Sequence, residues 1–462
     1  MSLVLYYSIN MDENVIFANP QILEPVLPKS SSKKFLKIII GMLALLIIGF
    51  IVFNILTSLT KETKNEKVTL LYWEISQDSK VESIISDFET QHPNIAINSV
   101  GQDIKQYTQR VTARIQNNTG PDVFSFHNTW LPIFWSVLAP VPKDTITKAD
   151  FEKWFYKVMQ NDLVKNGAIY GIPLEIDTLS LYINTQIFKA AGLSSPKNWV
   201  DFSNIARELT IKDENGKIVT SGAAVGTFDN ITHAGDVVSL FLLQNGTDLN
   251  DISSTAKSAS EALDFYTSFA INDKVWDDTF EPSVISFAKG NVAMFFGYSR
   301  DFFTIKSTNP DLLFEIYPVP NLSQNMTIAS YWAKGVSIKS KHQKEAMLFL
   351  KYLAQKETQQ KLFAEQSKTR EFGNPYARRD IANLLKDNAN VYPFVSQAED
   401  AVSSFFASDT YDNSLNSQMN SYLGDAINSI LSGAFPQTAV DSLSKGVSQV
   451  REQYSTTLPR AQ

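Results

Sequence analysis

The stretch from Tyr170 to Asn184, Tyr-Gly-Ile-Pro-Leu-Glu-Ile-Asp-Thr-Leu-Ser-Leu-Tyr-Ile-Asn, decides the fold. Two short apolar runs, 169–174 and 179–183, are joined in it by an acidic link, Glu175 to Thr178. Short apolar runs beside glycine and proline are typical of buried strands. A link between two such strands lets the chain cross from one lobe to another and places carboxylate oxygens where they can bind a polar ligand. We therefore predict a hinge here, with Asp177 either binding a ligand or lying in solvent.

Length and composition limit the class of protein. A chain of 462 residues is too long for one hydrophobic core, because single cores stop growing at about 250–300 residues. The hydrophobic share of 44% with 19% charged residues is typical of globular proteins, and the net charge of −7 gives no basic surface for nucleic acid. The chain contains no cysteine, which excludes disulfides, thiolate metal sites, a cysteine nucleophile and a lipid-modified cysteine.

The N-terminal region differs from the rest of the chain. Residues 1–35 lack sustained periodicity and are rich in proline and serine, so we interpret them as a flexible cytoplasmic tail, in which Met1 and Met11 are alternative starts. Residues 36–60 are predicted to form a transmembrane helix, and residues 61–67 a polar linker.

The transmembrane prediction depends on length and flanking charge. Residues 38–60 contain no charged side chain, and 23 helical residues reach about 34 Å, enough for a hydrocarbon core of about 30 Å. Lysines directly before this run favour a cytoplasmic N-terminus and an extracytoplasmic folded part. The alternative is a cleaved signal peptide, which the long leader and the absence of an Ala-x-Ala site disfavour.

The folded part begins with a strand, a helix and a strand. Residues 68–73 are apolar, Val81 to Phe88 has helical spacing, and residues 95–100 form a second strand pattern, which together predict a βαβ unit with a right-handed crossover. A further strand begins after Gly120 and ends at 126–130, the carboxyl edge where open α/β sheets place ligand-binding loops.

Several ordered stretches then resemble one family. They are the opening stretch, Ile-Phe-Lys-Ala-Ala-Gly-Leu at 187–193, Phe-Glu-Thr-Gln-His-Pro-Asn-Ile at 88–95, Thr-Gly-Pro-Asp-Val-Phe at 119–124, and Phe-Ala-Lys-Gly-Asn-Val-Ala-Met-Phe-Phe-Gly at 287–297. This pattern resembles the family 1 extracellular solute-binding proteins, relatives of maltose-binding protein that deliver sugars to ABC importers. The resemblance extends over most of residues 68–460.

The resemblance implies a fold and a domain arrangement. The fold class is α/β, a two-lobed periplasmic-binding-protein-like fold in which each lobe is a mostly parallel sheet flanked by helices, with one N-terminal transmembrane helix in addition. The first lobe comprises residues 68–176 and 317–370, and the second comprises 177–316 and 371–462. Hinge segments at 175–178, 313–319 and 370–375 are expected to absorb closure of the lobes.

The resemblance also implies site residues. The crossing carboxylate is Asp177. After the strand that begins at Gly120, Asn128 replaces the family's usual acidic residue, and Trp130 is the candidate stacking platform unless it is a core tryptophan. In the loop after 287–297, Tyr298 stands where relatives place a stacking aromatic, and Arg300 pairs with a carboxylate or a ligand oxygen.

Three more residues complete the predicted ligand site. At Trp332 the family has a glycine-rich turn, so Tyr331-Trp332 is a departure that predicts an aromatic wall. Asp229 ends a second-lobe strand pattern and is expected to face the cleft. Glu74 follows the first strand, and with Asp177 it is the pair of carboxylates that a glycosidase would need.

Catalytic signatures are absent from the sequence. It contains no dinucleotide, phosphate-loop, zinc-protease or nucleophile-elbow motif, and its four histidines are scattered. We therefore expect no cofactor, no metal and no catalytic residue. We predict instead a monomeric ectodomain that binds a carbohydrate and docks on an ABC permease in the same membrane. The alternatives are a ligand-sensing ectodomain that signals to a membrane partner, and an anchored glycosidase.

Overall fold

The computed structural model describes residues 32–59, 67–75, 81–321 and 325–455. The chain divides into two compact units, Met1–Glu66 and Lys67–Gln462, which we describe separately. Most of the predicted tail and of the predicted linker lies outside the described residues.

The described part of the first unit is one helix, α1 (Ser32–Leu59). The stretch Leu36–Asn54 in this helix is long and apolar enough to cross a membrane, by length and composition. The helix begins at Ser32, so the last four residues of the predicted tail, 32–35, belong to it. The expectation of an apolar N-terminal helix is confirmed, and this finding fits an anchor as well as a signal sequence.

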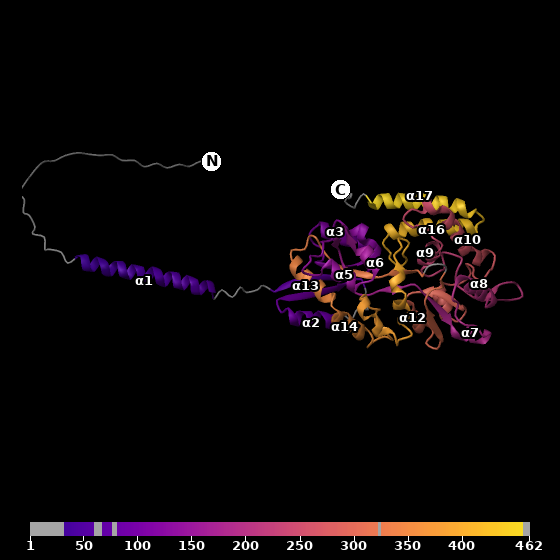
Figure 1. Cartoon of the computed structure of the whole chain (residues 1–462), viewed down its shortest axis with the longest axis horizontal. Coiled ribbons are helices and arrows are strands. Elements are labelled where there is room, and N and C mark those ends of the chain that lie inside the picture. Colours follow the sequence, from indigo (N-terminus) through magenta and orange to yellow (C-terminus); the bar gives the residue numbers. More distant parts are fainter. Residues whose placement is uncertain (1–31, 60–66, 76–80, 322–324, 456–462) are drawn as a thin grey trace, which may run out of the picture. The chain divides into compact units, whose positions relative to one another are not determined.

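The second unit begins with a five-stranded mixed sheet. In spatial order its strands are β2 (Ile95–Gly101), β1 (Val68–Glu74), β3 (Val123–His127), β14 (Trp332–Val336) and β6 (Ile172–Pro173). Strand β1 is parallel to β2 and β3, as the βαβ pattern predicted, whereas β14 runs antiparallel to both β3 and β6. Helices α2 (Glu82–Gln91), α13 (Gln343–Leu353) and α14 (Lys356–Gln366) pack around this sheet (Figure 1).

The second sheet differs from the expectation of a mostly parallel sheet. Strand β8 (Ser180–Asn184) lies between β11 (Met294–Gly297) and β12 (Phe314–Tyr317), and both pairings are antiparallel. Strand β8 is the apolar strand predicted after the acidic link, but both of its neighbours, β11 and β12, run antiparallel to it. A separate antiparallel pair is formed by β9 (Ile211–Lys212) and β10 (Ile218–Thr220).

The chain crosses between the sheets through paired strands. Strand β7 (Asp177–Thr178) pairs antiparallel with β13 (Thr327–Ser330), which also pairs with β15 (Ala401–Val402). Close by, Glu175 forms an isolated bridge with Tyr376. These pairings bring together the segments on either side of the predicted crossing. The residue ranges assigned to the two lobes stay a prediction.

The remaining helices complete both lobes. They are α3 (Tyr107–Gln116), α4 (Leu131–Phe134), α5 (Lys148–Trp154), α6 (Lys157–Leu163), α7 (Thr185–Ala191), α8 (Trp199–Glu208), α9 (Ala234–Gln244), α10 (Ala256–Ile271), α11 (Ser283–Ala288), α12 (Ser299–Thr308), α15 (Tyr392–Ser396), α16 (Leu415–Leu431) and α17 (Pro436–Ser455). The last two run alongside each other and pack on α10 (Figure 1).

Aromatic side chains form much of the second-lobe core. Trp199, at the start of α8, contacts Phe241 and Phe296, and its indole N–H donates to Gln244 (2.7 Å). Its ring is buried, so its role is structural. Because such rings fill the interior, an aromatic residue at a strand end is not by itself evidence of a ligand site.

Candidate functional site

A cavity of about 240 Å³ lies where the chain crosses between the sheets. We call it the Asp177 cavity. It is lined by Glu74, Ile75, Val81, Ser125, Leu174, Glu175, Ile176, Asp177, Ser299, Arg300, Ser330, Trp332, Lys334, Leu362, Gln366, Arg370, Asn374 and Pro375. These residues come from the first sheet, from the crossing strands β7 and β13, and from helices α12 and α14, so side chains far apart in sequence share one space. Crevices outside strand ends are where open α/β folds bind ligands.

Asp177 is fixed by the first turn of helix α12. Ser299 donates its backbone N–H to both carboxylate oxygens (3.1 and 3.0 Å) and its hydroxyl to Oδ2 (2.7 Å). The positive end of a helix dipole and the exposed first N–H groups stabilise a carboxylate at this place. Burial nevertheless raises the pKa of Asp177 to about 7. At neutral pH this group is therefore able both to donate and to accept hydrogen bonds.

A buried ion pair lies on the first-lobe wall. Lys334 Nζ is 3.5 Å from Glu74 Oε1, and it donates a hydrogen bond to Ser125 Oγ (2.7 Å). Both charged side chains are less than one-tenth exposed, and the Tyr72 hydroxyl also donates to Glu74 Oε1. A lysine in the middle of a central strand is costly unless it is paired. The pair therefore keeps a cation and an anion at fixed positions beside the cavity.

The side of the cavity nearest the crossing carries a second group of charged residues. Asn374 donates to Glu175 and accepts from Arg370. Burial raises the pKa of Glu175, while Lys334 opposes that rise. The cavity thus has carboxylates, cations and amides on several sides, an arrangement that suits a ligand rich in both donors and acceptors.

Trp332 supplies the aromatic surface of the cavity. It is half-buried, and its ring packs edge-on against Trp130, with ring centroids 5.1 Å apart. The ring is also fixed by His127 at 5.3 Å. A tryptophan supported on one side and lining a polar cavity on another can pack on the apolar face of a ring-shaped ligand.

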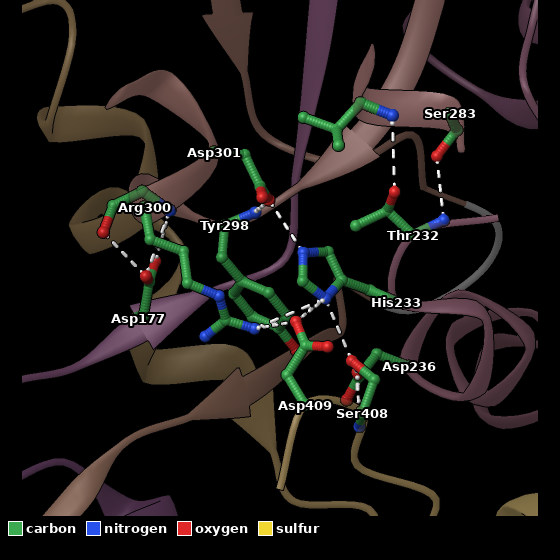
Figure 2. A network of polar contacts seen from close by, with 12 residues as sticks. Asp177, Thr232, His233, Asp236, Ser283, Tyr298, Arg300, Asp301, Ser408 and Asp409 are labelled. Atoms are coloured by element: carbon green, nitrogen blue, oxygen red, sulfur yellow. Dashed lines mark hydrogen bonds and ion pairs between the residues drawn. The ribbon is translucent and has the colours of Figure 1, made fainter. Parts of the chain in front are cut away.

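Arg300 joins the cavity to a charge network around the buried His233 (Figure 2). Its guanidinium donates to Asp409 Oδ2 (2.9 Å) and lies 5.1 Å from the centre of the Tyr298 ring. His233 lies between Asp301 (2.8 Å) and Asp409 (3.2 Å). Burial alone would lower the pKa of His233, but the two carboxylates raise it to about 10, so this histidine is a cation at neutral pH.

Four of the eight predicted site residues line the Asp177 cavity together: Glu74, Asp177, Arg300 and Trp332. Their role in ligand binding stays a prediction. Asp177 is only partly exposed, so the alternative of a freely solvated hinge residue does not describe its position.

Trp130 and Tyr298 do not line this cavity. Both rings are fully buried: Trp130 donates its indole N–H to Asn416 (2.9 Å), and Tyr298 packs between His233 and the Arg300 guanidinium. A stacking platform needs a ring face open to the ligand, which neither residue has in this structure. Trp130 therefore has the core position that the sequence left open as an alternative.

Asn128 and Asp229 lie in other places. Asn128 lines a separate cavity of about 450 Å³ and donates to Asp162 (3.3 Å) and Ser403 (2.7 Å). Asp229 is exposed at a third cavity, where it accepts a 3.4 Å hydrogen bond from Asn428. The structure thus does not bring these two residues together with Asp177.

Sequence reasoning missed several charged residues of the cavity. Lys334 carried a usable signal, since it interrupts the otherwise uncharged strand Trp332–Val336. Glu175 belongs to the predicted acidic link, but no sequence pattern marks it as a site residue, and Arg370 has no local pattern that marks it. Among the described residues no group of histidine, cysteine or acidic side chains has the arrangement of a metal site.

The raised carboxylate pKa values predict a pH dependence of stability. Burial raises the pKa of Asp162 to about 6, and that of Asp177 to about 7. Because both exceed the unfolded value of about 3.9, their contribution to stability is complete below about pH 4 and is lost as pH rises through 6 and 7. We expect Asp177→Asn to flatten the plot of Tm against pH between 5 and 8, measured by differential scanning fluorimetry. The exposed Asp229→Asn should keep the wild-type slope, and an unchanged slope in Asp177→Asn would contradict the assignment.

Comparison with known proteins gives one consistent result. The family described as "Bacterial extracellular solute-binding protein" matches this chain over residues 72–360. A multiple sugar-binding protein of Streptococcus mutans is 23% identical over 341 residues, covering 66% of this chain and 76% of that protein. An uncharacterised ABC transporter extracellular-binding protein of Pyrococcus horikoshii is 23% identical over 357 residues, covering 69% and 77%.

Solved structures share the two-lobed fold. The sugar-binding protein MalE of Xanthomonas citri superimposes with a TM-score of 0.69 at 18% identity, covering 86% of this chain and all of that one. A cyclo/maltodextrin-binding protein complexed with maltotetraose superimposes with a TM-score of 0.66 at 16% identity. The match covers 85% of this chain and 98% of that one. A solute-binding protein of Thermotoga lettingae bound with α-D-tagatose superimposes with a TM-score of 0.64 at 19% identity. The match covers 83% of this chain and 99% of that one.

These relatives are solute-binding proteins rather than enzymes, which confirms the expectation of binding without turnover. The two-lobed α/β fold expected from the ordered landmarks is likewise confirmed. With the family match spanning most of the folded unit and the crossing strands flanking a polar cavity, this chain belongs to the bacterial extracellular solute-binding proteins.

Proposed function

We propose that this protein is a membrane-anchored, extracytoplasmic receptor that binds a sugar or oligosaccharide in the Asp177 cavity and delivers it to an ABC-type importer. The observation that carries the proposal is the composition of that cavity. One tryptophan surface, Trp332, lies beside charged hydrogen-bonding groups from the first sheet, the crossing strand β7 and helix α12. The sugar ligands named for three similar proteins support the class of ligand.

The cavity offers a sugar two kinds of contact. The apolar face of a pyranose packs on the Trp332 ring, while its hydroxyl groups bind the carboxylate of Asp177 and the ion pair of Glu74 and Lys334. Hydrogen bonds in which one partner is charged are stronger than neutral ones, and exclusion of water strengthens them further.

Closure of the lobes around the ligand excludes that water. The paired crossing strands β7 and β13, together with the bridge from Glu175 to Tyr376, are the segments able to absorb such a motion. The closed form then presents surfaces of both lobes to a permease, so the bound and free states differ for that partner. The folded unit is expected to act as a monomer.

Trp332 provides a direct test of the aromatic contact. Replacing Trp332 by alanine should weaken sugar binding by about 1 kcal/mol, roughly fivefold in Kd, because the stacking surface is lost. Isothermal titration calorimetry measures the change. Trp332→Phe, which keeps a ring, should recover part of the affinity, and equal affinities for Trp332→Ala and wild type would contradict the contact.

The proposed anchor is helix α1, because Leu36–Asn54 is long enough to span a bilayer. An anchored receptor remains near its permease, and its effective concentration there is set by the linker. We expect the full chain to stay in the membrane pellet after a carbonate wash, with the N-terminal residues present by mass spectrometry. A mature protein that begins after residue 55 and is released into solution would show a cleaved signal peptide instead.

A thermal-shift panel tests the function itself. The full chain in detergent is screened against maltotetraose, α-D-tagatose, mannobiose and acarbose, with amino acids, short peptides and polyols as other classes. A rise in Tm that depends on the concentration of a carbohydrate is expected, because a ligand that binds only the folded state stabilises it. Stabilisation by another class alone would overturn the choice of a sugar.

A further inference from the structure

A buried chain of hydrogen bonds leads from the Asp177 cavity to the first turn of helix α16. Ser330 Oγ lies 3.1 Å from His127 Nε2, and His127 Nδ1 lies 2.8 Å from Thr129 Oγ1. Thr129 Oγ1 in turn lies 3.0 Å from Asn416 Oδ1. All four side chains are buried, and of these four only Ser330 lines the Asp177 cavity. The direction of each hydrogen bond decides what Ser330 offers to a ligand.

The orientation of the Asn416 amide is fixed from two sides. The indole N–H of Trp130 is able only to donate, and it lies 2.9 Å from Asn416 Oδ1. On the other side, Asn416 Nδ2 donates to the backbone carbonyl of Phe405 (2.9 Å), which is able only to accept. A flipped amide would place two donors together and two acceptors together. Atom Oδ1 therefore faces Thr129 as an acceptor.

The directions of the other hydrogen bonds follow from this amide. Thr129 has one hydroxyl hydrogen, which it must donate to Asn416 Oδ1. Its oxygen is then left to accept, so His127 must donate from Nδ1. The Thr129 backbone N–H also approaches His127 Nδ1, at 3.4 Å. This contact is weaker than the 2.8 Å contact between Nδ1 and Thr129 Oγ1, so the shorter contact determines that Nδ1 carries the hydrogen.

The charge of His127 settles the last step. Burial, with a contribution from the Arg300 cation, lowers the pKa of His127 to about 3, so the ring is neutral at physiological pH. A neutral imidazole with its hydrogen on Nδ1 has an acceptor at Nε2. Ser330 must therefore donate its only hydroxyl hydrogen to His127.

We propose that Ser330 is a specificity-determining residue that presents only lone pairs to the Asp177 cavity, so that the bound ligand must place a hydrogen-bond donor against it. This proposal rests on the proposed function for its ligand half. A free sugar hydroxyl satisfies it, whereas an ether, carbonyl or carboxylate oxygen at the same place leaves two acceptors facing each other. The chain of hydrogen bonds thus selects a sugar with an unmodified hydroxyl at this position.

The histidine tautomer is measured directly by nuclear magnetic resonance. With only four histidines, the full chain labelled with ¹⁵N-histidine in lipid nanodiscs gives few ring signals, and His127→Gln identifies those of His127. We expect Nδ1 to resonate as a protonated nitrogen and Nε2 as an unprotonated one at pH 7. A hydrogen on Nε2, or a charged ring, would overturn the proposal whether or not any sugar binds.

Variants of Thr129 test the cause of the tautomer. Thr129→Val removes the hydroxyl with little change in shape, and should raise the fraction of His127 that carries its hydrogen on Nε2. Thr129→Ser should restore the wild-type signals. Thr267→Val is the matched control, because this buried hydroxyl bonds only its own helix (2.8 Å to the Leu263 carbonyl), and it should leave His127 unchanged. A wild-type tautomer in Thr129→Val would show that the relay does not set it.

The need for a ligand donor at Ser330 is tested with the sugar that raises Tm most in the thermal-shift panel. Its hydroxyls are replaced one at a time by fluorine, which keeps the size of the group but removes the donor. One position should lose about tenfold in affinity with wild type, because Ser330 then has no donor to accept from, and this loss should disappear in Ser330→Ala. Identical losses in both proteins would overturn the role of Ser330. A panel without any sugar that binds would instead refute the proposed function and leave the tautomer result standing.

Discussion

Replacing His233 by leucine should lower the free energy of unfolding by about 3–5 kcal/mol, the largest effect that we expect from one substitution. His233 is a buried cation between Asp301 (2.8 Å) and Asp409 (3.2 Å), and Asp301 is itself buried (Figure 2). Leucine fills similar space but leaves the buried carboxylate without its partner. Urea unfolding at pH 7, followed by fluorescence, measures the loss.

The pH dependence of this effect follows from the histidine. Because the folded pKa of His233 is raised to about 10 from an unfolded value of about 6.5, its contribution is complete below pH 6.5 and is lost as pH rises through 10. The difference between wild type and His233→Leu should therefore shrink between pH 7 and 10. His342→Leu, at the start of α13, is the control and should change stability little. A loss below 1 kcal/mol in His233→Leu would show that the ion pairs do not stabilise the second lobe.

Asp177→Asn should weaken sugar binding by about 10- to 100-fold. At pH 8, above the raised pKa of Asp177, the carboxylate is charged, and a hydrogen bond to it from a ligand hydroxyl contributes about 1.5–3 kcal/mol. The substitution turns one acceptor oxygen into a donor. An amide oxygen at the position of Oδ2 still accepts from both the Ser299 N–H (3.0 Å) and its hydroxyl (2.7 Å), so the fold should be retained. Calorimetric titration measures the affinity, and circular dichroism confirms the fold.

The matched control for Asp177 is Asp229. Both carboxylates were expected at the cleft from the sequence, but Asp229 is exposed and does not line the Asp177 cavity. Asp229→Asn should therefore bind the sugar as wild type does. Equal losses in the two variants would indicate a general effect of charge rather than a contact at the crossing.

Much of the architecture follows from local sequence patterns. The parallel unit β1–α2–β2 and the strand β8 after the acidic link form where apolar patterns predicted them. The antiparallel direction of strands β11 and β12 could not be predicted from the sequence, because periodicity identifies a buried strand but not the strand that pairs with it. Their antiparallel pairing depends on contacts distant in sequence.

The candidate site shows the same division. Asp177 is predicted from the acidic link at the crossing, and Trp332 from its departure from the family's glycine-rich turn; both line the cavity. Trp130 follows the end of strand β3, but its indole N–H finds a partner in Asn416, nearly three hundred residues later in the chain. No local pattern distinguishes a tryptophan that faces a ligand from one that faces a distant helix. Lys334 and Arg370 reach the cavity through the same kind of long-range contact.

The most direct test of the central claim is a calorimetric titration of the full chain, in detergent, with the panel sugar that stabilises it most. Wild type and Asp229→Asn are expected to bind with the same Kd, and Asp177→Asn with a Kd about 10- to 100-fold higher. Unchanged binding by Asp177→Asn would contradict the account, since the ligand would then lie outside the Asp177 cavity.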